Sequence, residues 1–286
     1  MIVDAHQHFL FPSRVAYSWL TGHALEPLRR DFAPGDLEPE LLRNGVSQTV
    51  LVQTHSSLIE TREFLRIAAQ TRFVAGVVGW VDLTAPNVAA TLEALLSEPD
   101  GRWLVGVRHQ IQGEADPRWL LRDDVQHGLE ALGARGLVFD LLVSERELPA
   151  ALEVAQAQPD LGFVIDHAAN PDIKAGEHEP WRAALEPLAN CANVFVKLSG
   201  LTTRADWRAW TAEDIAPYAK TCLELFGVER CLWGSDWPIC LLAGSYAQTL
   251  EVLRVALTAH SHEASHAVLG DNAIRAYQLP EFEASV

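Results

Sequence analysis

The chain is poor in the features that mark secreted or membrane proteins. It has four cysteines among 286 residues, and none of them is spaced as in a CxxC or CxxxC motif, so neither a disulfide framework nor a zinc knuckle is indicated. No apolar run approaches the ~18 residues of a transmembrane helix, and the first residues lack the basic and apolar regions of a secretory signal. We therefore expect a reduced, cytoplasmic protein with no membrane partner.

Basic residues are scarce relative to acidic ones. Lys and Arg number 22 and Asp and Glu number 38, which gives a net charge of −16. A field of this sign repels the phosphates of nucleic acids and of anionic lipids. The composition therefore argues against nucleic acid as a partner and against a nuclease. The composition does not determine the oligomeric state, and a homo-oligomer is compatible with it.

Internal repeats, low-complexity tracts and linker-like segments are also missing, so we treat residues 1–286 as a single domain. Short β-branched apolar runs instead alternate with segments of helical periodicity. The runs expected to form strands are 2–5, 49–52, 73–81, 104–107, 137–143, 163–165, 194–198 and 231–233. The segments expected to form helices are 38–44, 58–70, 88–96, 119–132, 145–157, 181–188, 213–226 and 246–258, with a last helix at 263–277.

This alternation favours an α/β protein built as a single (β/α)₈ TIM barrel, because its strands are apolar throughout and so suit burial on both faces. A doubly wound open sheet is the alternative that the alternation does not exclude. In both architectures the active site lies at the C-terminal ends of the strands.

Two histidines lie at the end of the first predicted strand. His6 and His8 are two residues apart, so in a strand their imidazoles point to the same face and can bind one metal ion. A hydrogen-bonded pair of buried histidines would give the same pattern.

Two further polar residues follow later predicted strands. His167 comes after the apolar run 163–165, and Asp236 follows the run 231–233 within LWGSDWP. At the mouth of a barrel, Asp236 would face the histidines and either bind a metal or accept a proton from water. Because Pro238 follows closely, Asp236 is also a candidate helix N-cap.

Two charged residues at other strand ends each have two possible roles. Arg108 offers a donor fork that suits a carboxylate or a lactone oxygen, or it forms a surface ion pair. Lys197 ends an apolar run, so it either pairs with an acid such as Asp166 or contacts substrate.

The sequence also lacks a GxSxG elbow, a GxGxxG turn and a phosphate-binding loop, which argues against a serine hydrolase and against dinucleotide or nucleoside triphosphate ligands.

Motifs in order along nearly the whole chain resemble one known family. They are DAHQHF, YSWL, VVGWVDL, LVGVRHQ, FDLLV, FVIDHAANP, VFVKLSGL, LWGSDWP and LGDNAIRAYQL. Together they resemble the amidohydrolase-related family of the amidohydrolase superfamily, and within it the hydrolases of sugar lactones such as L-fuconolactone and L-rhamnonolactone.

The resemblance implies a (β/α)₈ barrel that opens a sugar lactone to its aldonic acid with an activated water. It assigns catalysis to His6, His8, His167 and Asp236, with Asp236 as the general base. Either a single divalent ion, zinc or manganese, binds to His6, His8 and Asp236, or the reaction needs no metal. A two-metal centre is not expected, because Arg108 stands near the position of the family's bridging lysine.

Polar and aromatic residues at the strand ends are the candidates for holding the substrate, although Asn170 departs from the family, in which related chains often carry Lys or Arg at this position. Gln53, Trp80, Arg108, His109 and Asn170 are the candidate substrate-binding residues, with Trp80 as an apolar wall. The alternative function on the same scaffold is a metal-dependent decarboxylase, or another hydrolase of the superfamily, that acts on a small carboxylated substrate. A sugar-acid binding protein without catalysis is the third reading.

Overall fold

The computed structural model describes residues 1–280, and in it eight parallel strands pair in the order of the sequence. The strands are β1 (Ile2–Gln7), β2 (Val46–Val52), β3 (Val74–Gly79), β4 (Leu104–His109), β5 (Val138–Leu141), β6 (Phe163–Ile165), β7 (Val194–Leu198) and β8 (Cys231–Trp233). The ring closes where the backbone N–H of His8 donates to Trp237 O at 2.7 Å and that of Asp236 donates to His6 O at 2.8 Å. The barrel prediction is confirmed and the open-sheet alternative is wrong.

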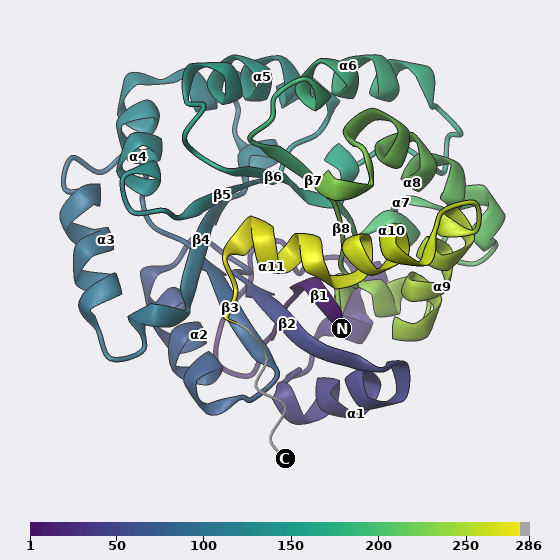
Figure 1. The fold of residues 1–286 in the computed structure, drawn as a ribbon. Coiled ribbons are helices and arrows are strands. Elements are labelled where there is room, and N and C mark those ends of the chain that lie inside the picture. The colour runs from purple at the N-terminus through teal and green to yellow at the C-terminus, as the bar shows by residue number, and fades with distance from the viewer. Residues whose placement is uncertain (281–286) are drawn as a thin grey trace.

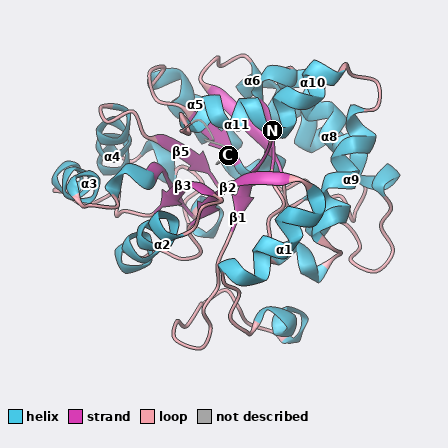
Figure 2. Cartoon of the chain, turned by 60° about the horizontal axis from the view of Figure 1, so that its bottom comes forward, coloured by secondary structure: helices cyan, strands magenta, loops and turns pink. Residues whose placement is uncertain are grey.

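Helices surround the strands (Figures 1 and 2). They are α1 (Pro34–Asn44), α2 (Leu58–Gln70), α3 (Val88–Ser97), α4 (Asp123–Gly133), α5 (Leu148–Ala157), α6 (Glu179–Ala189), α7 (Leu201–Arg204), α8 (Ala212–Phe226), α9 (Tyr246–Leu257), α10 (His262–His266) and α11 (Asn272–Tyr277). All of these helices except α10 contain buried residues, as expected for helices that surround a (β/α)₈ barrel. No helix in the described part of the chain is both long and apolar enough to cross a membrane.

The barrel interior is filled from the bottom by small β-branched side chains and by the end of the chain. Val3, Val50, Val78 and Val164 belong to this inner cluster, and so does Tyr277 of α11. The segment of α10 and α11 crosses the ring of strands in Figure 1. Because this end is covered and packed, the polar residues at the opposite strand ends are left to form a pocket.

The observed elements differ from the expected ones at several bounds, and two helices differ more strongly. The last helix, expected at 263–277, is interrupted by a π-helical turn, Ala267–Asp271, between α10 and α11. The sequence analysis also missed α7, a single turn that begins directly after Gly200. One turn is too short to show a 3.6-residue periodicity, so it leaves no signal in the sequence.

Candidate active site

The two histidines of β1 lie side by side at the centre of the barrel. His6 Nε2 and His8 Nε2 are 3.1 Å apart, and both residues are buried. The Nδ1 of His8 lies 2.7 Å from the carbonyl oxygen of Val52. Since a carbonyl can only accept, this bond places the proton of His8 on Nδ1.

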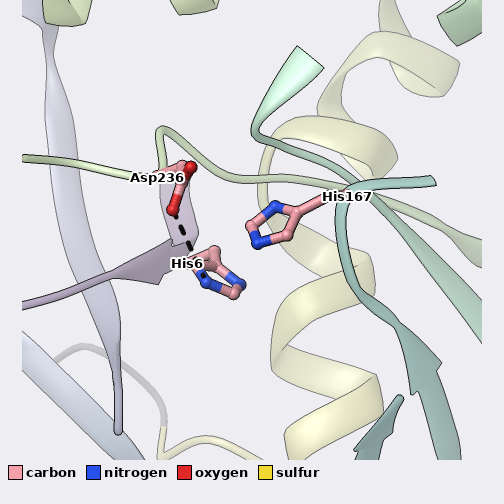
Figure 3. Close-up of side chains that lie close together, drawn as sticks. All are labelled: His6, His167 and Asp236. Carbon is pink, nitrogen blue, oxygen red and sulfur yellow. Dashed lines mark ion pairs between the residues drawn. The ribbon is translucent and has the colours of Figure 1, made fainter. Parts of the chain in front are cut away.

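Asp236 approaches this pair from the neighbouring strand end after β8, and His167 approaches it from the end of β6. One oxygen of Asp236 lies 3.4 Å from His8 Nε2 and 3.8 Å from His6 Nε2. Figure 3 shows the His167 ring directed toward His6 and Asp236. One ligand atom from each of His6, His167 and Asp236 lies within 4.8 Å of the others, so the structure brings all four predicted catalytic residues together.

The backbone around Asp236 explains how its carboxylate reaches the histidines. Asp236 has a left-handed conformation, with φ 58°. Gly234 precedes it and lies so close to β1 that an added Cβ would be 2.7 Å from the Cβ of His6. The carboxylate of Asp4 then accepts hydrogen bonds from Ser235 N at 2.8 Å and from Ser235 Oγ at 2.6 Å, which ties this loop to β1. The N-cap position of the next 3₁₀ helix belongs to Pro238, so Asp236 is not the helix cap that its spacing allowed.

Beneath His6 lies a buried network of charges. Asp166 Oδ2 accepts from Arg108 Nη1 at 2.8 Å, and its other oxygen lies 3.0 Å from Lys197 Nζ and 3.2 Å from His6 Nδ1. Lys197 also pairs with Asp140 at 2.5 Å. The predicted pairing of Lys197 with Asp166 is confirmed. Arg108 is buried, so the surface ion pair considered for it is wrong.

Burial and these neighbours set the charge states. Burial alone would raise the pKa of Asp166, but Lys197, His6 and Arg108 surround it and hold its pKa well below the usual value. Burial raises the pKa of Asp140 to about 6, although Lys197 lies against it. Desolvation lowers the pKa of both His6 and His167, so both imidazoles are neutral near pH 7.

The network ends at a tyrosine from the last helix. The hydroxyl of Tyr277 donates to the carboxylate of Asp140, and the two carboxylate oxygens lie 2.8 and 3.0 Å from the hydroxyl oxygen.

We expect Tyr277→Phe to lower the free energy of unfolding by about 2 kcal/mol, because a buried carboxylate loses a donor. Urea denaturation measures this change. Tyr218→Phe is the matched control, since the Tyr218 hydroxyl makes no hydrogen bond within the described residues; equal losses in both variants would contradict the prediction.

The arrangement of nitrogen lone pairs favours a cation between the histidines. Arg108 Nη1 lies 3.2 Å from His6 Nε2, and because a guanidinium can only donate, this bond requires an unprotonated Nε2. In the tautomer of His8 that donates from Nδ1 to Val52, Nε2 is also unprotonated. Two unprotonated nitrogens thus lie 3.1 Å apart beside the carboxylate of Asp236. The nitrogen of His6 accepts the bond from Arg108 here, and it would exchange that bond for a bond to a metal ion. This set of imidazole and carboxylate donors fits a single divalent metal ion.

A pocket of about 870 Å³ opens above these residues. Of the predicted substrate-binding residues, Arg108, His109 and Asn170 line it. Gln53 and Trp80 are not among its lining residues. The fully buried Gln53 side chain donates to the carbonyl oxygen of Arg108, and Trp80 Nε1 donates to His109 Nδ1 at 3.1 Å. They support pocket residues from behind instead.

Four further residues line the pocket: Trp19, His55, Arg204 and Trp207. The sequence pattern already places His55 among the polar residues at strand ends and Trp19 near the mouth of the barrel. Arg204 and Trp207 were not predicted to line a pocket. Arg204 is the last residue of the short helix α7, and Trp207 follows it. The sequence gives no signal for this helix. Ser199 belongs to the polar residues that the sequence places at strand ends, and its Oγ lies 2.9 Å from His167 Nδ1.

The family model described as "Amidohydrolase" matches residues 3–279. The chain belongs to the amidohydrolase family. Its motifs, barrel and clustered histidines therefore agree with the resemblance inferred from the sequence.

Individual relatives of the chain carry names that specify an activity, which the family model does not. The chain is 42% identical over 245 residues to an L-fucono-1,5-lactonase of Burkholderia ambifaria, covering 85% of this chain and 82% of the relative. It is 36% identical to an L-fucono-1,5-lactonase of Burkholderia multivorans, covering 98% and 96% of the two chains. A crystal structure of an amidohydrolase from Burkholderia multivorans with bound zinc has a TM-score of 0.91 at 35% identity, covering 98% of this chain and all (100%) of that one.

Proposed function

We propose that this chain is a lactone hydrolase that opens a sugar-derived 1,5-lactone to its aldonic acid, with L-fucono-1,5-lactone as the substrate class. The observation that carries the proposal is the carboxylate of Asp236, which lines the pocket beside His8 and His167. The two L-fucono-1,5-lactonase relatives support the choice of substrate.

In the proposed reaction Asp236 removes a proton from water as the water oxygen bonds to the lactone carbonyl carbon. The carbonyl electrons move onto the carbonyl oxygen. When this oxyanion collapses, the bond between the carbonyl carbon and the ring oxygen breaks, and Asp236 returns its proton to the ring oxygen. The new carboxylic acid ionises near pH 7, so each turnover releases one proton to solvent.

The oxyanion needs hydrogen-bond donors, and the guanidinium of Arg108 supplies them. Its Nε has no hydrogen-bond partner among the described residues, although the atom is buried, so this donor is not already used within the protein. One well-placed donor in such a site contributes roughly 3 kcal/mol to transition-state stabilisation. His109 and Asn170 line the same pocket and are proposed to bind the sugar hydroxyls.

We further propose that His6, His8, His167 and Asp236 hold a single zinc or manganese ion, since their unprotonated nitrogens and carboxylate converge. When bound, such an ion supplies Lewis-acid polarisation and lowers the pKa of a bound water. His167 joins the metal ligands predicted from the sequence because the structure places its ring beside His6, with ring centroids 4.5 Å apart.

This site predicts stabilisation by metal. Zinc added to chelator-treated protein at about 100 times its dissociation constant should raise the melting temperature by about 5 °C, because binding to the folded state alone adds roughly 2.7 kcal/mol. Differential scanning fluorimetry measures the shift. The control is His6→Asn, in which the shift should disappear. An unchanged melting temperature in the unmodified protein would contradict the proposed metal site.

Proton release tests the proposed activity. Purified protein is mixed with a panel of L- and D-aldonolactones and followed with a pH indicator, before and after removal of metal with a chelator. We expect turnover of L-fucono-1,5-lactone above the spontaneous rate. No acceleration with any lactone, together with release of CO₂ from carboxylated substrates, would instead support a decarboxylase.

A further inference from the structure

The segment that carries His167 winds in the left-handed sense. Residues 167, 168, 169 and 170 have φ values of 53°, 49°, 59° and 55°, although none of them is glycine. The N–H of Asn170 donates to the carbonyl oxygen of His167 at 2.8 Å and closes the turn. In L-amino acids this conformation brings Cβ too close to the following carbonyl oxygen, so it persists only where the surroundings enforce it.

The left-handed conformation is most unusual at the two alanines of the turn. Ala168 and Ala169 are completely buried and have no polar side chain that would favour a left-handed backbone. Asn170 is different, because asparagine tolerates this region and the following Pro171 disfavours a right-handed helical conformation. The sequence thus explains one end of the turn, while the two alanines must be held by contacts from elsewhere.

The contact that holds Ala168 comes from α6. The indole Nε1 of Trp181 donates to the carbonyl oxygen of Ala168 at 2.6 Å, and both residues are buried. Reversing the hand of the turn would rotate this peptide group and direct the carbonyl away from the indole. A buried carbonyl without a partner is unfavourable, so the bond to Trp181 selects the left-handed form.

A second bond acts at the far end of the turn. Asn170 Nδ2 donates to the carbonyl oxygen of Val143 at 2.8 Å, and Val143 lies just beyond β5. The turn is therefore attached to α6 on one side and to the end of β5 on the other. The turn carries His167, whose ring Figure 3 shows directed toward His6 and Asp236.

We propose that Trp181 is a positioning residue for the reaction and acts by holding the left-handed turn that presents His167. Asn170 has the same role, beside any contact with substrate. This inference rests on the proposed catalytic function of His167. Trp181 does not touch the reacting atoms, because it is not a lining residue of the pocket.

The test is Trp181→Phe, which keeps an aromatic ring and removes the indole donor. We expect kcat for L-fucono-1,5-lactone to fall at least ~10-fold with KM changed less than threefold, since a displaced catalytic group acts on the chemical step. Hydrogen exchange of the Asn170 amide, read by mass spectrometry, should become faster. This second readout needs no substrate.

The matched control is Trp210→Phe. The Trp210 indole likewise donates to a backbone carbonyl, that of Ala243 at 2.7 Å, but outside the turn. It should lower the melting temperature by a similar few degrees while kcat and Asn170 exchange stay near the unmodified values. If Trp181→Phe does not fold, Asn170→Asp removes the Nδ2 donor to Val143 at constant size and should make exchange of the residue-170 amide faster. Because Asn170 is also proposed to bind substrate, only the exchange readout is used for this variant, and unchanged exchange would overturn the inference.

The outcomes separate this inference from the proposed function. An unmodified protein without lactonase activity would contradict the function, while the exchange measurement would still test whether Trp181 holds the turn. Unchanged Asn170 exchange in Trp181→Phe would overturn the inference. Faster exchange with unchanged kcat would overturn it as well, because the turn would then not position a catalytic group.

Discussion

Asp236→Asn should lower kcat for L-fucono-1,5-lactone by about 10³-fold, because the amide cannot accept the proton of the attacking water. The substitution changes the volume little, and the backbone bond from Asp236 N to His6 O does not depend on the side chain. Stability should therefore change far less than activity. Steady-state kinetics at saturating lactone, together with urea denaturation, distinguish the two effects.

The control for this variant is Asp82→Asn. Asp82 also follows a barrel strand, but it is exposed, and its carboxylate accepts from Thr84 N and Thr84 Oγ1, at 3.0 and 2.6 Å. Asparagine can keep these bonds, so kcat should remain within about twofold. Activity of Asp236→Asn close to that of the unmodified protein would exclude Asp236 as the general base.

Gly200→Ala should lower kcat by about 10²-fold. An added Cβ would lie 2.5 Å from His167 Nδ1 and 3.3 Å from the carboxylate of Asp236, where ordinary contact begins at 3.4 Å. The His167 ring must therefore move by roughly 1 Å, a displacement that can reduce a rate a hundredfold. The variant should also lose about 1–2 kcal/mol of stability, because Gly200 has φ +64°.

Gly136→Ala separates these two effects. Gly136 has φ +67°, but a Cβ there would meet nothing within 4 Å. This variant should show the same backbone strain in urea denaturation and an unchanged kcat. Equal activity in the Gly136 and Gly200 variants would show that the close approach of Gly200 to His167 has no part in catalysis.

The architecture could be predicted because it depends on apolar periodicity. The strands at 163–165, 194–198 and 231–233 were predicted with their observed bounds, since these short runs are mostly apolar and each is flanked by polar residues or glycine. β1 extends to Gln7, two residues beyond the expected end, because His6 lies inside the strand, where an apolar pattern ends too early.

The site could be predicted only in part. Asp236 and His167 stood out because each follows an apolar strand that has no packing use for a charged or polar side chain. The left-handed turn behind His167 was not predicted, since Ala168 and Ala169 are residue types typical of right-handed helices. Its conformation depends on Trp181, a residue distant in sequence, so no local pattern could reveal it.

The burial of Gln53 and Arg108 was not predicted for a similar reason. Gln53 follows β2 and Arg108 lies near the end of β4, and the sequence places both at the barrel mouth. Gln53 instead turns its side chain away from the pocket, with Nε2 donating to the carbonyl oxygen of Arg108 at 3.2 Å, whereas Arg108 is buried but still lines the pocket. Contacts between neighbouring strands decided which strand-end residues reach the pocket, and a single sequence does not contain this information.

The most direct test of the account is hydrolysis of L-fucono-1,5-lactone in H₂¹⁸O, with the product analysed by mass spectrometry and the spontaneous reaction subtracted. The proposed attack at the carbonyl carbon predicts one ¹⁸O atom in the carboxylate of the aldonic acid, formed far faster than without protein and about 10³-fold more slowly with Asp236→Asn. A rate equal to the spontaneous one, or ¹⁸O in the new hydroxyl group, would contradict lactone opening by a water that Asp236 activates.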